Sequence, residues 1–454
     1  MTQEQRPGRP DEDRSRLSRI DAPLRAPFLL LFGSAALWLT LSSVLSLLAA
    51  LKALPAGLGS CEWFAHGRLE AAARNAFVYG WAGNALFAIN LWLLAQLGRF
   101  EIRNGWMASV GGLFWNLALT WCTISVIVSG PGAYALLDFP VGAGPVLAAS
   151  FALAGLWPVV AYAKRPTGHN FAAQWFVVGA SVTFLLAFLL AQAAVFWAPA
   201  SGVVQAVAHS WYVRTVHLLW LGGSALGLGY YFVSKVLARP LHAYYLASVA
   251  FWTYFLFAGW TAPASLIGSP VPLWIQSIGV VGSKMLLVPV LLIGLNLLGA
   301  LSRDGGWSRA WNSTSLRFIS IGIVSLLASL AIAAWASARS VNAGLRFTSF
   351  AEGQNLLLLY AGVTFCVFGA AYAALPRVSG GRWPSAAAIH VHFWASALGA
   401  AGAAFSAFAH PSAHGLISAV SAALLLLGHF AFASNAFAAL LSGVPAGESQ
   451  PAHD

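Results

Sequence analysis

Charged side chains are scarce in this sequence: aspartate, glutamate, lysine and arginine make up 8% of its 454 residues. Soluble domains carry about 25%. Apolar residues make up 59% of the chain, and the mean hydropathy is +0.74. This balance excludes a soluble globular domain. The formal net charge of +11 does not indicate nucleic-acid binding, because the basic residues lie mainly in tails, loops and the ends of apolar runs.

Cysteine is almost absent, which excludes a disulfide framework. The three cysteines are Cys61, Cys122 and Cys366, and they show no Cys/His spacing typical of a metal site. The sequence also has no Cys-x-x-Cys-His motif for c-type haem, no Glu-x-x-His di-iron pattern and no glycine loop that could cradle a phosphate. The common signatures of redox and nucleotide enzymes are therefore missing.

Apolar runs long enough to cross a bilayer recur from end to end. They predict an all-α polytopic membrane protein of about twelve transmembrane helices, with a polar tail at 1–25, a membrane domain at 26–442 and a short tail at 443–454. The predicted spans are 27–51, 75–98, 107–129, 142–163, 171–197, 203–234, 242–267, 272–301, 314–337, 347–375, 384–409 and 413–442.

Basic residues are distributed unequally between the two sides of this predicted bundle. Sixteen lie in the tail and loops on the side of the termini, and five lie on the other side, namely Lys52, Arg68, Arg74, Arg339 and Arg346. Cytoplasmic loops carry the excess of lysine and arginine. We therefore expect both termini in the cytoplasm.

Three charged residues fall deep inside predicted spans, namely Arg214, Lys284 and Glu352, whereas Arg317 lies near the start of the span at 314–337. A charge in the hydrocarbon layer costs at least about 2.5 kcal/mol, so it is usually paired, faces a cavity or has a function. We expect these three to be deeply buried and to mark the site that matters most.

Histidines within spans are the candidate haem or copper ligands. His390 and His392 are two residues apart, so a helix would present them on opposite faces and could ligate two haems. His209 and His217 are eight apart and share a face. The alternative for both pairs is a structural role as polar packing groups.

Short motifs along residues 60–400 resemble subunit I of the cbb3-type (C-family) haem–copper oxidases. Those in the first half are Gly67-Arg68-Leu69, Asn75-Ala76, Gly83-Asn84-Ala85-Leu86, Trp211-Tyr212, Tyr230-Tyr231-Phe232-Val233, Lys235, Arg239-Pro240, Tyr244, Leu246, Phe251-Trp252, Trp260 and Pro263. Those in the second half are Pro272 to Trp274, Gln276, Gly279, Val341-Asn342-Ala343, Thr348, Gly353, Tyr372, Pro376-Arg377 and His392-Phe393-Trp394.

The resemblance implies two b-type haems and one copper held by six histidines, but this sequence has other residues at those positions. The low-spin haem ligand falls at Ala73, the copper ligand of the sixth helix at Arg214 and the adjacent copper pair at Ala264-Ser265. The His-x-His of the tenth helix falls at Gln354 and Leu356, and the family's redox tyrosine falls at Ala258. His392 survives, but the resemblance gives it no metal. We therefore predict no cofactor.

Arg214, Lys284 and Glu352 would then occupy the space that holds the haems and copper in the family. We expect the Arg214 guanidinium to donate to Gln354, and we expect Glu352 to pair with Arg74 beside Ala73. Lys284 has no acidic partner that the sequence identifies, so it is either neutral or faces a bound anion or lipid headgroup.

Three functions remain open. The first is a cofactor-free, non-catalytic scaffold or anchor subunit of a respiratory complex in the bacterial inner membrane, with other membrane subunits and a c-type cytochrome subunit as partners. The second is a terminal oxidase or nitric oxide reductase relative that binds haem b through displaced ligands such as His217, His390 and His392. The third is a transporter or sensor that uses the vacated pocket.

Overall fold

The computed structural model describes residues 10–54, 59, 61–102, 104–166, 168, 170–200, 202–346, 348–407 and 411–441. Every regular element in those ranges is a helix, so the predicted all-α membrane fold is confirmed. The predicted tail at 443–454 lies outside the described residues. Helix α1 (Pro10–Lys52) covers much of the segment expected to be the first tail, and Ile20 and Leu24 are fully buried. The boundary at residue 26 stays a prediction.

Eleven helical segments of the described chain are long and apolar enough to cross a membrane. They are α1, α2–η2–α3 (His66–Asn75, Ala76–Gly83 and Asn84–Gly98), α4 (Gly105–Ser129), α5–α6 (Ala143–Ala154 and Trp157–Ala163), α7–η3 (Ala172–Gln192 and Ala193–Trp197), α8–η4–α9 (Val203–Arg214, Thr215–Gly222 and Gly223–Leu237), α11–α12 (Leu273–Met285 and Leu287–Leu301), α14 (Thr314–Ala336), α16–η7–α17 (Phe350–Leu356, Leu357–Val363 and Thr364–Ser379), α18 (Ala386–Ser406) and α19 (Pro411–Leu441). Short helices η1 (Glu62–Phe64), α13 (Gly306–Asn312) and α15 (Arg339–Leu345) lie between them.

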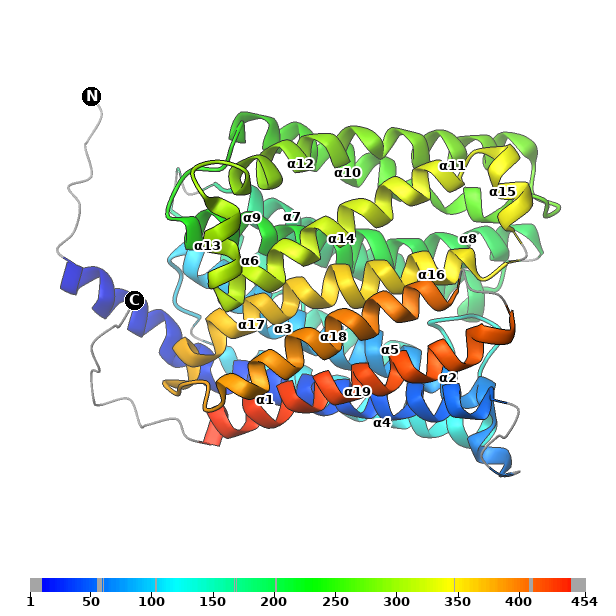
Figure 1. Cartoon of the computed structure of the whole chain (residues 1–454), viewed down its shortest axis with the longest axis horizontal. Coiled ribbons are helices and arrows are strands. Elements are labelled where there is room, and N and C mark those ends of the chain that lie inside the picture. The colour runs from blue at the N-terminus through cyan, green and yellow to red at the C-terminus, as the bar shows by residue number, and fades with distance from the viewer. Residues whose placement is uncertain are drawn as a thin grey trace.

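The remaining predicted span, 242–267, is broken into three pieces. These are η5 (Tyr244–Leu246), α10 (Ala247–Gly259) and η6 (Ala262–Leu266), so no single helix there reaches spanning length. Figure 1 shows that α1 begins and α19 ends at the same end of the bundle, which we call the terminus face; the opposite end is the far face. An even number of crossings is needed for that arrangement, and α10 with its flanking turns supplies the twelfth.

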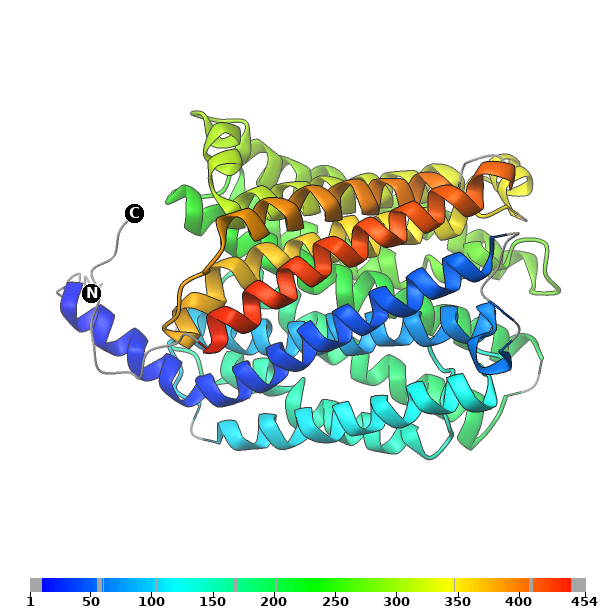
Figure 2. The same ribbon diagram turned by 60° about the horizontal axis from the view of Figure 1, so that its bottom comes forward.

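Neighbouring helices pack along their lengths, and the first and last crossings lie side by side. Figure 2 shows α19 running between α1 and α18, and Arg25 of α1 donates to the carbonyl of Ser379 at the end of α17 (3.0 Å). Gly80 lets α1 come close, because an added Cβ would lie 2.6 Å from the Trp38 ring. Small residues at such contacts are typical of helix packing in membranes.

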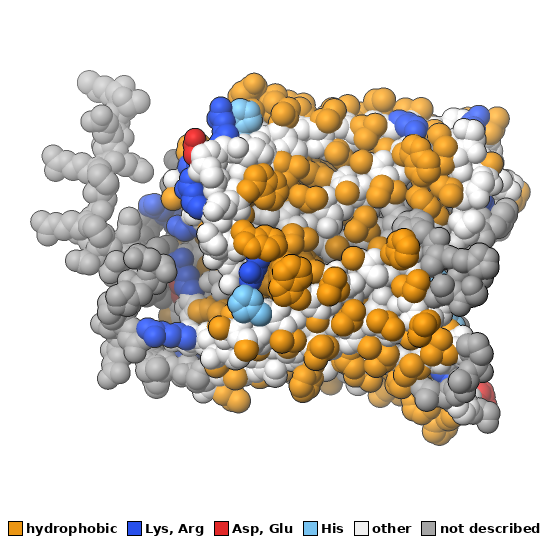
Figure 3. Space-filling model, viewed as in Figure 1, with side chains coloured by type: hydrophobic (Ala, Val, Ile, Leu, Met, Phe, Trp, Pro, Cys, Tyr) orange, Lys and Arg blue, Asp and Glu red, His pale blue; other side chains and the backbone are white. Residues whose placement is uncertain are grey.

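Aromatic rings fill the middle of the bundle. Phe184 lies against Trp220, with ring centroids 3.9 Å apart, and Trp115 packs edge-on against Tyr79 at 6.1 Å. All four side chains are at most 1% exposed. The outer surface is also apolar, and Figure 3 shows hydrophobic side chains over the middle of the molecule with basic residues concentrated near the terminus face. This surface suits a surrounding bilayer.

Candidate functional site

Four crossings of the described chain contain a π-helical segment, and three of these segments begin within three residues of a predicted former ligand position; the fourth is η3, at the end of the α7–η3 crossing. Segment η2 begins at Ala76, after Ala73; η4 begins at Thr215, after Arg214; and η7 begins at Leu357, after Leu356. π-Helical segments are rare in proteins as a whole, and those that occur are often found at functional sites. The backbone next to the predicted haem and copper positions is therefore π-helical in η2, η4 and η7, which the sequence did not reveal.

Arg214 ends α8 and is half-buried rather than deeply buried. One turn before it, the Ser210 hydroxyl lies 2.8 Å from that of Ser265 and donates to the carbonyl of Ala262. The structure therefore places α8 beside η6, which carries Ala264 and Ser265, and brings these predicted copper positions together. Among the described residues, Arg214 has no ion pair and no hydrogen bond to its side chain.

The predicted hydrogen bond from Arg214 to Gln354 is wrong. Gln354 is buried and donates from its side-chain amide to the carbonyl of Ser329 (3.4 Å), while the Ser329 hydroxyl donates to the Gln354 carbonyl (3.1 Å). The cause is the packing of α16 against α14, which turns Gln354 toward Ser329.

The predicted pair between Arg74 and Glu352 is also wrong. Arg74 pairs with Asp138 at 3.2 Å and with Glu70, one turn earlier on α2, at 3.6 Å. Glu352 lies in the first turn of α16 and is exposed, because that helix begins only two residues earlier, at Phe350, near the far face. Lys284 is half-exposed near the end of α11, and the described residues offer it no partner.

The structure instead identifies Asp138, which the sequence analysis missed. Its side chain is 2% exposed and accepts from Arg74 and from the backbone nitrogen of Leu136 (3.2 Å). Burial raises the pKa of Asp138 above its ordinary value of 3.8, against the lowering influence of Arg74. The one signal in the sequence was an acid inside an apolar loop segment, Leu136-Leu137-Asp138-Phe139-Pro140.

A second buried contact joins the same loop to α8. Tyr79 of η2 donates its hydroxyl to the carbonyl of Leu136 (2.6 Å), and its hydroxyl also lies 2.6 Å from that of Tyr212. Since Tyr79 already donates to the carbonyl, Tyr212 donates to Tyr79. The loop at 130–142 is thus fastened from inside the bundle by Arg74, Tyr79 and Tyr212.

The four candidate histidines lie in different environments. His217 is 6% exposed, and neither of its ring nitrogens has a hydrogen-bond partner among the described residues. His392 is fully buried and its Nδ1 lies 2.7 Å from the Tyr372 hydroxyl, whereas His390 is exposed. Only one ring nitrogen of His392, Nε2, is without a hydrogen-bond partner among the described residues. His209 contacts the carbonyl of Ala135 through Nε2 (2.9 Å).

The residues present do not fit the copper site that the resemblance implies. Within the described ranges, no three histidine, cysteine, aspartate or glutamate side chains come together as a metal-binding group. The alanine, serine and arginine at positions 264, 265 and 214 are not ordinary copper ligands. We therefore derive no chemistry through copper.

Comparisons with known proteins agree with the fold and the motifs. The family model described as "Cytochrome C and Quinol oxidase polypeptide I" matches residues 27–433. Relatives include the cbb3-type cytochrome c oxidase subunit CcoN1 of Stutzerimonas stutzeri, 25% identical over 354 residues, which are 74% of this chain and 72% of the relative. Another is a cytochrome c oxidase subunit 1 homolog of Azorhizobium caulinodans, 25% identical over 357 residues, which are 74% of this chain and 62% of the relative.

A third relative is the bacteroid subunit 1 homolog of Bradyrhizobium diazoefficiens, 24% identical over 375 residues, with 78% of this chain and 66% of the relative covered. The chain therefore spans between three fifths and three quarters of the length of these relatives. The match covers most of the twelve-crossing bundle, and the chain belongs to the cytochrome c and quinol oxidase polypeptide I family.

Proposed function

We propose that this chain is a cofactor-free, non-catalytic relative of oxidase subunit I that serves as a scaffold or anchor subunit in an electron-transfer complex. The observation that carries the proposal is the composition of the predicted copper position. A guanidinium at Arg214 cannot ligate copper, and the neighbouring Ala264 and Ser265 offer no imidazole.

The proposed location is the bacterial inner membrane, with both termini in the cytoplasm. The supporting observation is the concentration of basic side chains at the terminus face in Figure 3. Lysine and arginine accumulate in cytoplasmic loops, and the relatives are bacterial oxidase subunits by name.

A c-type cytochrome subunit and other membrane subunits are the proposed partners, because the relatives are named as subunits of cytochrome c oxidases. To test this, an affinity-tagged chain would be purified from membranes of its own host in mild detergent. We expect a haem-stained c-type cytochrome to co-purify in constant ratio through size-exclusion chromatography. Isolation of the chain without any other membrane subunit would contradict the scaffold role.

A second candidate function, a haem protein with displaced ligands, is favoured by one specific observation. His217 is buried with both ring nitrogens unpartnered among the described residues, which is costly for a polar group unless something binds it. Under this alternative His217 would hold haem b, and His217→Ala would remove a Soret band from the purified protein. The cofactor-free proposal instead predicts that neither protein has such a band.

A further inference from the structure

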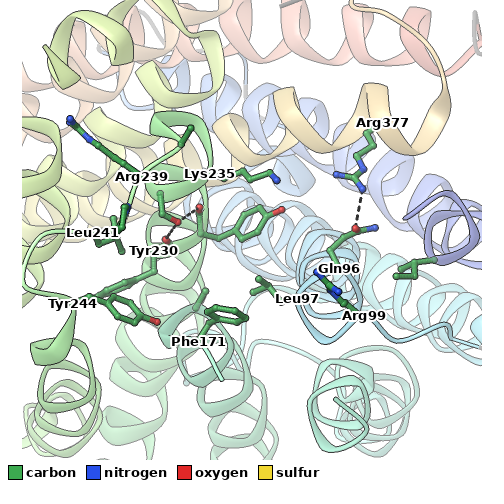
Figure 4. Close-up of a pocket in the computed structure, with 16 residues that line it drawn as sticks. Gln96, Leu97, Arg99, Phe171, Tyr230, Lys235, Arg239, Leu241, Tyr244 and Arg377 are labelled. Atoms are coloured by element: carbon green, nitrogen blue, oxygen red, sulfur yellow. Dashed lines mark hydrogen bonds between the residues drawn. The ribbon is translucent and has the colours of Figure 1, made fainter. Parts of the chain in front are cut away.

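A partly open cavity of about 740 Å³ lies at the terminus face, away from the predicted redox core. Its walls come from the ends of α3, α9 and α17, the beginning of α7 and the loop after α9. In Figure 4, Lys235 and Arg239 lie on one side of this cavity, and Gln96, Arg99 and Arg377 lie on the other. Four cations therefore border one space, and none of the residues that line it is acidic.

Two of these four cations are already neutralised. Arg239 pairs with Asp304 (3.0 Å) and also donates to the carbonyl of Arg303 (2.6 Å). Arg377 pairs with Asp21 (3.1 Å) and donates to the side-chain oxygen of Gln96 (3.0 Å). These contacts hold both guanidinium groups in place at the cavity wall.

The other two cations, Arg99 and Lys235, are exposed. Among the described residues, neither has an ion pair or a side-chain hydrogen bond. The other residues that line the cavity are neutral or already paired. Arg99 and Lys235 therefore leave the cavity with two unpaired positive charges, which one phosphate group would balance. Charge-assisted hydrogen bonds from arginine and lysine are the usual means of holding phosphate.

The remaining lining favours a ligand with an organic part. Leu97, Phe171 and Leu241 are apolar lining residues. In Figure 4, Leu97 and Phe171 lie toward the middle of the cavity, and Leu241 lies on the side of Arg239. The volume lies in the range of about 300–1,000 Å³ that is typical of small-molecule sites, which is more space than inorganic phosphate fills. The Tyr231 hydroxyl, which has no hydrogen-bond partner among the described residues, adds a neutral donor.

We propose that this cavity binds a phosphate-bearing organic anion, with Arg99 and Lys235 contacting the phosphate and Leu97, Phe171 and Leu241 contacting the organic part. The same chemistry could come from a soluble nucleotide or from the headgroup of an anionic phospholipid. Neither source requires a haem or copper in the bundle, so the site is independent of the proposed scaffold role.

The test uses the full chain in nanodiscs and measures how fast sulfo-NHS-acetate acetylates Lys235, by mass spectrometry. One arm adds ATP or inorganic phosphate to phosphatidylcholine nanodiscs, and the other replaces part of the lipid with phosphatidylglycerol. We expect ATP or phosphatidylglycerol to slow acetylation of Lys235 severalfold. Lys164, an exposed lysine outside the cavity, should react at an unchanged rate.

Calorimetric titration of the protective probe then compares two charge-matched double variants. Arg99→Gln with Lys235→Gln should weaken binding about tenfold or more, because it removes the charge-assisted bonds. Arg303→Gln with Lys164→Gln removes two exposed cations outside the cavity lining and should leave binding unchanged. Protection by ATP would identify a soluble ligand, and protection by phosphatidylglycerol alone would identify a lipid. Equal acetylation of Lys235 in all arms would overturn the proposal, and this readout on the unmodified chain does not depend on the variants folding.

Discussion

Arg214 is half-buried at the end of α8, and no described residue pairs with its guanidinium. A cation in such a place costs free energy without returning an ion pair. We predict that Arg214→Leu raises the free energy of unfolding by about 1 kcal/mol, measured as a higher melting temperature in detergent.

Arg68→Leu is the matched control, because Arg68 donates to the carbonyls of Ile127 and Val128 (3.0 and 2.8 Å) and pairs with Glu62. This replacement should lower the melting temperature. A lower melting temperature for Arg214→Leu would show that Arg214 has a stabilising partner, and would favour a bound ligand beside Arg214.

Asp138, in the loop at the far face, should make the stability of the folded protein depend on pH. Because its pKa in the folded protein is raised above 3.8, its protonation favours folding. Its contribution to stability is fully present below pH 3.8 and is lost as the pH rises through the folded-state pKa. The groups that face it are Arg74, the side chain of Asn75 and the Leu136 amide.

Arg74→Gln removes the charge that lowers this pKa, so the loss of stability should extend to higher pH and become larger. Melting temperatures between pH 4 and 7 would be compared for the wild type, Arg74→Gln and Asp138→Asn. The last variant should lack this part of the pH dependence. Identical pH profiles for all three would contradict the assignment to Asp138.

Side-chain pairings within the candidate site were the least predictable part of the structure. The sequence identified Arg214, Arg74 and Gln354 as residues of interest, but it paired Arg74 with Glu352 when the partner is Asp138. The choice depends on where α16 begins and on how the loop at 130–142 folds inward, and both are set by tertiary packing. No local pattern in the sequence encodes either.

At the scale of helices, η6 packs closely against α11 because Gly279 of α11 has no side chain. A Cβ at Gly279 would lie 2.7 Å from the carbonyl carbon of Pro263 and closer still to the backbone nitrogen of Ala264. Backbone atoms cannot move aside as a flexible side chain can. We therefore predict that Gly279→Ala lowers the free energy of unfolding by about 1–3 kcal/mol and displaces the segment that carries Ala264 and Ser265.

Gly294→Ala, in α12 of the same crossing, is the control because an added Cβ there meets nothing within 4 Å. Alanine should be neutral or stabilising at that position, since it favours helix more than glycine does. Equal melting temperatures for the two variants would argue against the close packing of η6 on α11.

The helical spans themselves were largely predictable, because long apolar runs determine where a chain crosses a bilayer. The π-helical segments and the division of residues 244–266 into η5, α10 and η6 were not. Both follow from how the crossings pack together, and hydropathy does not report that. The prediction of a deeply buried Glu352 failed for a related reason, since α16 begins at Phe350 and leaves position 352 in its exposed first turn.

At the scale of the whole molecule, the orientation of the bundle can be tested with its own cysteines. Cys61 is exposed on the far face, whereas Cys122 and Cys366 are buried. If both termini are cytoplasmic, a membrane-impermeant maleimide should label Cys61 in intact spheroplasts. A Cys61→Ala protein carrying Lys235→Cys should be labelled only after permeabilisation, and the reverse pattern would contradict the proposed orientation.

The oxidase subunit I fold is proposed to persist here without its redox cofactors. The most direct measurement is the amount of haem and copper in the purified full-length chain, from a pyridine haemochrome spectrum and metal analysis. We expect no Soret band and no stoichiometric copper in a folded, monodisperse protein. One or more haems per chain, retained through purification, would contradict it.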